Sequence, residues 1–111
     1  MPDLSLEVSC RQLQDCLQQG RNIYLLDCRT HEEFQQAAIE GAHLIPMSEL
    51  PARLQELPAE GTMPIVVYCH HGLRSLSVAQ WLMQQGFNNA KSLAGGIDAW
   101  AQWIDPSVPR Y

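Results

Sequence analysis

The chain has 111 residues, of which 46% are hydrophobic and 17% are charged, and its net charge is −5. This length fits one domain, residues 1–111, built around one core. No apolar run reaches the roughly 18 residues typical of a membrane span, and the basic residues form no cluster that would bind nucleic acid. The first residues lack the basic and apolar regions of a secretion signal, so we expect a cytoplasmic protein with no membrane or nucleic-acid partner.

Strand signals alternate with helical ones from the start of the chain, which predicts an α/β fold with a largely parallel sheet. A weak strand over 6–8 precedes Ser9, which with Gln12 has the spacing of a capping box. The helix that this box opens ends at Gly20. The apolar run over 23–26 is typical of a buried strand.

A second capping box, Thr30 with Glu33, predicts a short helix after that strand. A brief strand over 43–45 follows. We expect Ser48 to cap the next helix, with Pro51 in its first turn, where proline is tolerated.

The run over 65–68 is the strongest strand signal, because it is unbroken and rich in β-branched residues, as the centre of a parallel sheet requires. A helix is predicted from Ser75 to Gly86. The remaining elements are a strand over 90–93, a turn at Gly95-Gly96, a helix over 97–104 and an irregular tail over 105–111.

The segment that joins the strongest strand to its helix carries the chemistry. Ligands of open α/β sheets bind at the carboxyl ends of strands, where Cys69 lies. Gly72 allows the loop to turn its amides inward around an anion, and Arg74 adds a permanent charge. We expect Ser75 to cap the following helix. Loop amides and a helix N-terminus favour the reactive thiolate, so Cys69 is predicted to be a nucleophile, exposed at the floor of a compact, positively charged cradle.

Two alternatives apply to the residues of this loop. A cysteine after a strand can be a small core residue, although the glycine and arginine that follow favour the nucleophile. His70 and His71 are expected to line the loop as donors rather than to act as acids or bases. Adjacent residues do not converge readily on one ion, and no zinc-type spacing occurs, so no metal or cofactor is expected. The four cysteines predict no disulfide framework in this compartment.

Three stretches of the chain together resemble the rhodanese family of sulfurtransferases. The loop just described is the first. The sequence DCRTHEEF over 27–34, followed by IEGAHLIP over 39–46, is similar to the family's opening signature. The sequence LAGGIDAW over 93–100 is similar to its closing signature. The three occur in the family's order and span most of the chain.

The resemblance implies a rhodanese-like fold, a five-stranded, mainly parallel sheet with helices on both faces. It implies a thiosulfate sulfurtransferase that carries sulfur as a Cys69 persulfide from a donor such as thiosulfate to cyanide or a thiol. The substrate-binding loop is then His70, His71, Gly72, Leu73 and Arg74. Structural support is expected from Asp27 and Arg29, as an ion pair behind the site, and from Ser75.

Two positions depart from the family's pattern. Ala38 stands where the family often has histidine, which concerns local packing. Cys28 stands where a small aliphatic residue is usual. We expect Cys28 to fill the core, and a second working thiol is the alternative.

Three other functions compete with transfer of sulfur from a small donor. Related phosphatases and arsenate reductases place five residues between cysteine and arginine, whereas four lie between Cys69 and Arg74, which favours a single sulfur atom over a tetrahedral oxyanion. A persulfide relay with a sulfur-relay protein, such as a cysteine desulfurase, would use the same chemistry with protein partners. A non-catalytic interaction domain is disfavoured, because the cysteine is present.

Overall fold

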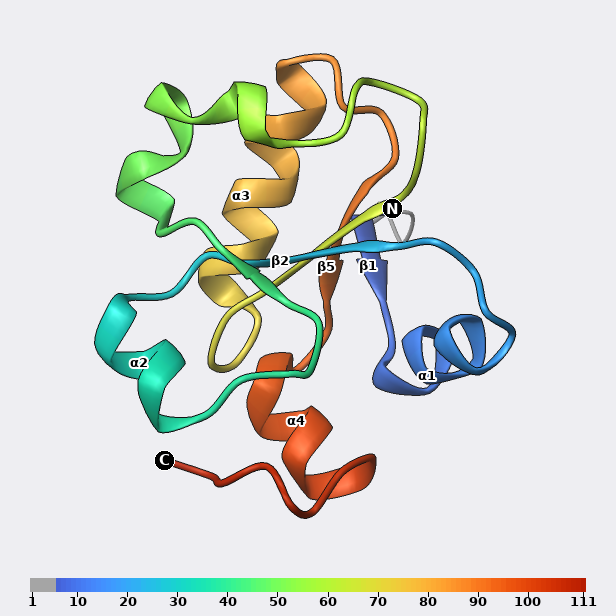
Figure 1. The fold of residues 1–111 in the computed structure, drawn as a ribbon, viewed down its shortest axis with the longest axis vertical. Coiled ribbons are helices and arrows are strands. Elements are labelled where there is room, and N and C mark those ends of the chain that lie inside the picture. Colours follow the sequence, from blue (N-terminus) through green and yellow to red (C-terminus); the bar gives the residue numbers. More distant parts are fainter. Residues whose placement is uncertain (1–5) are drawn as a thin grey trace.

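A parallel sheet of five strands forms the centre of the protein in a computed structural model, which describes residues 6–111 (Figure 1). The strand order is β1-β5-β4-β2-β3, and every neighbouring pair is parallel. The five-stranded α/β sheet is therefore confirmed. The strands are β1 (Glu7–Val8), β2 (Tyr24–Asp27), β3 (His43–Leu44), β4 (Ile65–Tyr68) and β5 (Ala90–Leu93).

Helices cover both faces of this sheet, as Figure 1 shows. On one face, α1 (Cys10–Gln18) and α4 (Gly96–Trp103) contribute to a buried cluster that includes Leu13 and Trp100. On the other face, α3 (Leu73–Gln84) and the 3₁₀ helix η2 (Met47–Ala52) contribute to a second cluster. The short elements α2 (His31–Gln36) and η3 (Leu54–Glu56) complete the fold.

The apolar residues of β4 explain its central place. All four residues of β4 are buried, because Val66 and Tyr68 belong to one cluster while Ile65 and Val67 belong to the other. A strand covered on both faces carries apolar side chains in an unbroken run. Among residues 6–111, no helix has both the length and the apolar character needed to cross a lipid bilayer.

Local sequence signals set the starts of two helices. Both predicted capping boxes are present, Ser9 with Gln12 at α1 and Thr30 with Glu33 at α2. The helix predicted after Ser48 is wrong, because residues 47–52 form a 3₁₀ helix with no side-chain cap. Pro51 lies inside this segment, and proline disrupts the hydrogen bonding of an α-helix interior.

A buried ion pair fixes the carboxyl end of β2. The Arg29 guanidinium donates to the Asp27 carboxylate through Nε at 2.9 Å and through Nη2 at 2.6 Å, and both side chains are fully buried. Arg29 Nη2 also donates to the carbonyl of Ala37, after α2. The predicted ion pair is confirmed, and it ties β2 to the chain beyond the next helix.

The Asp27→Asn substitution should destabilise the fold strongly. It would remove the carboxylate and leave a guanidinium buried without a counter-charge, which costs about 3–5 kcal/mol in comparable cases. Urea unfolding followed by circular dichroism measures the loss. The exposed Arg53–Glu56 pair is the matched control, so Glu56→Gln should leave the unfolding midpoint nearly unchanged. Equal shifts in the two variants would contradict the role given to the buried pair.

Candidate active site around Cys69

The loop from Cys69 to Ser75 turns directly from β4 into α3. The helix begins at Leu73 rather than at the predicted Ser75, and Gly72 occupies the N-cap position with φ of 104°. Glycine adopts that left-handed conformation without steric cost. Ser75 therefore lies in the first turn of α3, and the prediction that it caps the helix is wrong.

The sulfur of Cys69 lies where backbone amides converge. The amides of Gly72 and Ser75 donate to Sγ at 3.1 and 3.3 Å, and the Ser75 hydroxyl lies 3.4 Å from Sγ. The same hydroxyl is 2.7 Å from the hydroxyl of Ser92 on β5. The predicted inward orientation of loop amides is confirmed for these two groups. Such a nest of N–H groups stabilises a negative atom at its centre.

The burial of Cys69 differs from the expectation. Its side chain is only 1% exposed, so the predicted exposure at the floor of an open cradle is wrong. The physical reason is that Cys69 continues the face of β4 on which Val67 lies, and it joins the apolar cluster that includes Val78 and Leu82 of α3. The loop then closes over the sulfur. Leu73, which is 80% exposed, lies on the outside of the loop.

The first turn of α4 holds the other side of the loop. The amides of Ile97 and Asp98 donate to the carbonyls of Cys69 and His70, at 2.9 and 3.0 Å. Gly96 makes this approach possible, because a Cβ at that position would overlap both carbonyl oxygens. The turn predicted at Gly95-Gly96 lies one residue earlier, at Ala94-Gly95, and Gly96 is the first residue of α4. This close approach explains why two elements distant in sequence meet at this site.

Arg74 does not point to an open anion site as expected. Its guanidinium donates to both oxygens of Glu33, at 2.8 and 2.9 Å. This pairing holds the pKa of Glu33 well below its usual range, with a smaller contribution from Tyr111, and it raises the pKa of Arg74. The fixed charge beside the loop is therefore neutralised, and Arg74 ties α3 to α2.

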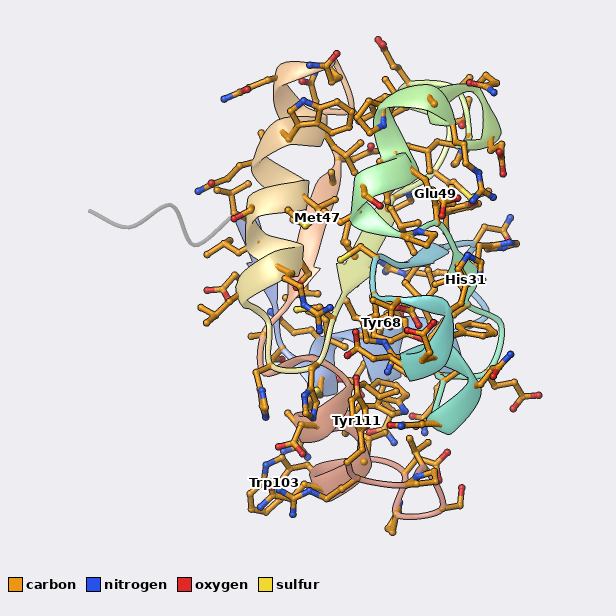
Figure 2. All side chains as sticks on the ribbon, turned by 90° about the vertical axis from the view of Figure 1, so that its left-hand side faces the viewer. His31, Met47, Glu49, Tyr68, Trp103 and Tyr111 are labelled. Carbon is orange, nitrogen blue, oxygen red and sulfur yellow. The ribbon has the colours of Figure 1, made fainter. Side chains whose placement is uncertain are left out.

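Tyr111 joins the same network from the far end of the chain. Its hydroxyl donates to Glu33 and accepts a hydrogen bond from Arg29, each at 2.7 Å. Figure 2 shows Tyr111 between α2 and α4, below Tyr68. The Tyr111 ring stacks on His70, which also stacks on His71, with centroid distances of 3.9 Å. His70 therefore lies between the rings of His71 and Tyr111, and this stack links the loop to the end of the chain.

Sequence reasoning missed three residues of this site: Glu33, Ser92 and Tyr111. Glu33 has a local signal as part of a capping box, a role that it fills, but that signal does not indicate its pairing with Arg74. Nothing local to Ser92 or Tyr111 indicated that they approach the loop. Of the predicted loop residues from His70 to Arg74, only Gly72 forms a hydrogen bond with the Cys69 sulfur, while Leu73 is exposed and Arg74 pairs with Glu33.

One group of side chains could be considered for a metal ion. The ligand atoms of His70, His71 and Asp98 lie within 4.8 Å of one another, and His70 Nε2 is buried without a hydrogen-bond partner. However, the Asp98 carboxylate is already paired with Arg110 at 3.0 Å, and the two imidazoles stack on each other. Burial, followed by the proximity of His71, lowers the pKa of His70. These contacts favour a structural role for the two stacked histidines over a metal site.

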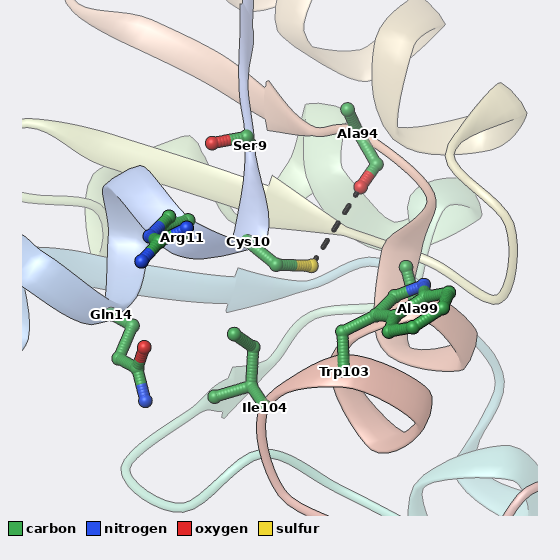
Figure 3. Close-up of a pocket in the computed structure, with 8 residues that line it drawn as sticks. All are labelled: Ser9, Cys10, Arg11, Gln14, Ala94, Ala99, Trp103 and Ile104. Atoms are coloured by element: carbon green, nitrogen blue, oxygen red, sulfur yellow. Dashed lines mark hydrogen bonds between the residues drawn. The ribbon is translucent and has the colours of Figure 1, made fainter.

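Two cavities of the described chain bear on access to the site. A groove of about 500 Å³ is lined by residues that include Cys28, Met47 and Arg74, so it adjoins the loop from the side of β2. A separate cavity of about 570 Å³ lies between α1 and α4 (Figure 3). There the Cys10 thiol donates to the carbonyl of Ala94 at 3.8 Å, and burial raises its pKa. No residue of 69–75 lines that second cavity, so the groove is the more suitable approach for a small molecule.

Comparison with known proteins finds similar sequences and structures among rhodanese-like sulfurtransferases. The sequence family model called rhodanese-like domain matches residues 9–102 of this chain. A sulfurtransferase of Allochromatium vinosum is 36% identical over 102 residues, which cover 92% of this chain and 94% of that protein. The structure of the human single-domain sulfurtransferase TSTD1 has a TM-score of 0.78 and 32% identity, and the alignment covers 88% of this chain and 96% of that one.

Larger proteins contain a similar segment. The adenylyltransferase and sulfurtransferase MOCS3-2 of Zea mays is 38% identical over 113 residues, which cover 96% of this chain. The chain spans only about a quarter of the length of that relative, since the alignment covers 23% of it.

The pairing of Arg74 with Glu33 predicts how stability depends on pH. Because the folded-state pKa of Glu33 lies below the ordinary value of about 4.3, the unfolded chain takes up a proton first as the pH falls. The contribution of Glu33 is therefore complete above about pH 5 and is lost on acidification toward the lower folded-state value. The wild type should be more stable than Glu33→Gln at neutral pH, and this advantage should shrink toward pH 2.

Urea titrations of both proteins at several pH values measure this difference. Glutamine can still serve in a capping box, so the variant isolates the charge from the cap. A difference in unfolding free energy that stayed constant across the pH range would contradict the ion-pair interpretation.

Proposed function

Because the chain belongs to the rhodanese-like domain family, we propose that it is a sulfurtransferase in which residues 1–111 act as one domain and Cys69 carries the sulfur. The observation that carries this proposal is the convergence of two backbone amides on Cys69 Sγ. It is supported by the Allochromatium vinosum sulfurtransferase, which this chain matches over nearly its whole length.

The first step is the loading of sulfur on Cys69. The thiolate attacks the outer sulfur of a donor such as thiosulfate, the S–S bond of the donor breaks, and sulfite leaves with the electron pair. The product is a Cys69 persulfide. The amides of Gly72 and Ser75 stabilise negative charge on the attacking sulfur, and other N–H groups of the loop can serve the persulfide.

The second step returns the enzyme to its starting state. A nucleophilic acceptor, cyanide or a thiolate, attacks the outer sulfur of the persulfide, and Cys69 leaves as the thiolate. The same two amides stabilise this leaving group, so one arrangement of donors serves both halves of the double displacement. No cofactor takes part in this scheme.

Two observations favour sulfur transfer over phosphate or arsenate chemistry. Phosphoryl transfer relies on a positive group that grips the equatorial oxygens, but both Nη atoms of Arg74 are occupied by Glu33. Cys69 is also buried, so the site suits the approach of one terminal sulfur atom better than a full oxyanion around Sγ. The groove beside Cys28 and Arg74 is the proposed path for the donor.

A persulfide relay between proteins is the second candidate. The maize relative joins a sulfurtransferase and an adenylyltransferase in its name, which supports a protein as the source or recipient of sulfur. The chemistry at Cys69 would be the same. Faster loading from the persulfide of a cysteine desulfurase than from thiosulfate would favour the relay, and the reverse order would favour the small donor.

The Cys69→Ser substitution should abolish sulfur transfer and leave the fold intact, because serine is close in size and lacks the thiolate. After treatment with thiosulfate, the wild type should gain about 32 Da on Cys69, as a covalent intermediate requires. Mass spectrometry and a thiosulfate:cyanide assay measure the two effects. Cys16→Ser, which changes a thiol on the remote helix α1, is the control. Full turnover by Cys69→Ser would refute the assignment of the nucleophile.

A further inference from the structure

Cys28 lies beside Cys69 at the carboxyl ends of two neighbouring strands. β2 and β4 are parallel, and their last registered pair is Asp27 with Tyr68. The amide of Cys28 then donates to the carbonyl of Tyr68 at 3.2 Å, and extending the register by one residue places Cys28 opposite Cys69. Neighbouring strands lie about 4.8 Å apart, which is within the Cα separations that a disulfide spans.

The two thiols also lie on the same face of the sheet. Cys28 and Cys69 belong to one buried cluster, together with Leu26 and Val67, the residues two positions before each. Residues two apart along a strand share a face. The Cys28 thiol donates to the carbonyl of Tyr68 at 3.5 Å, which places its sulfur next to the residue that precedes Cys69.

We propose that Cys28 is a second reacting thiol, which attacks the Cys69 persulfide at its inner sulfur and releases hydrosulfide. This inference rests on the proposed function, because it requires the persulfide. A bond forms between the sulfurs of Cys28 and Cys69, and the bond between Cys69 Sγ and the outer sulfur breaks. The outer sulfur leaves with the electron pair and takes the Cys28 proton, so Cys28–SH and Cys69–S–S⁻ become a disulfide and HS⁻.

The register selects the inner sulfur as the point of attack. That atom is Cys69 Sγ itself, and the extended register places it at the same level of the sheet as Cys28. A cellular dithiol can then reduce the disulfide. The groove lined by Cys28 and Arg74 gives the reductant access and gives hydrosulfide an exit. With such a dithiol, the chain would convert thiosulfate to sulfite and sulfide without an external sulfur acceptor.

The surroundings of Cys28 make it a slow nucleophile. Burial, with the nearby Cys69 and Asp27, raises the pKa of Cys28 to about 12. Few molecules carry the thiolate at neutral pH, and attack on sulfur depends on the thiolate fraction. An external acceptor therefore has time to take the sulfur first, and Cys28 acts only on a persulfide that no acceptor has reached.

A loading experiment without any acceptor tests this inference. The protein is treated with thiosulfate, freed of excess donor, and followed by intact mass and by release of sulfide. In the wild type, the species with about 32 Da added should convert to one about 2 Da lighter than the starting protein, with release of one sulfide per disulfide formed. Peptide mapping should link Cys28 to Cys69. In Cys28→Ala, the loaded species should persist about tenfold longer or more.

Cys16→Ala is the matched control and should behave as the wild type, since Cys16 lies on α1. Equal lifetimes of the loaded species in wild type and Cys28→Ala would overturn the inference, as would added sulfur mapped to Cys28 or a disulfide to Cys10. Because peptide mapping of the wild type needs no variant, a folding defect in Cys28→Ala leaves the test decisive. If Cys69 gained no sulfur in any of these proteins, the proposed function itself would fail.

Discussion

The rest of the site depends on the two backbone N–H groups, of Gly72 and Ser75, that meet at the sulfur of Cys69. Their position requires a helix that starts immediately after the loop, and it requires a residue that can adopt φ of 104° at its N-cap. It also requires that the loop carbonyls point the other way, where the first amides of α4 receive them. One turn of backbone thus has its donors directed at the sulfur and its acceptors at a neighbouring helix. A hydrogen-bonded loop of this kind is already organised before a donor arrives, which is the condition for electrostatic stabilisation of a reacting atom.

A second layer of charged and aromatic side chains surrounds that loop. Asp27 holds Arg29, Arg29 reaches Tyr111, Tyr111 reaches Glu33, and Glu33 holds Arg74. This chain of contacts joins β2, α2, the first turn of α3 and the end of the polypeptide. Its charges largely neutralise one another, so the polarity around Cys69 comes mainly from oriented peptide groups rather than from a free cation. Dipoles fixed in this way retain their effect where a mobile side chain would be screened by solvent.

The sequence predicted those features that depend on local chemistry. The strand over 65–68 and both capping boxes have signals within a few residues, and all are present. The glycine pair also carries a local signal, and the turn there lies within one residue of its predicted place. α3 begins two residues before the predicted Ser75, because Gly72 has no side chain that signals a cap and its φ of 104° is visible only in the folded loop. Tyr111 lies 82 positions from Arg29, so no local pattern could relate the two. Arg74 was expected to be free because its partner, Glu33, already had a local explanation. The burial of Cys69 follows from packing between β4 and α3, which a single sequence does not reveal.

A crystal structure of the protein after treatment with thiosulfate would test the central claim most directly, since it would show where the transferred sulfur lies. The account predicts one additional sulfur bonded to Cys69 Sγ, enclosed by the turn at 70–75 with its peptide N–H groups directed at the disulfur unit. An unmodified Cys69, or a loop whose amides had rotated away from the added atom, would contradict it.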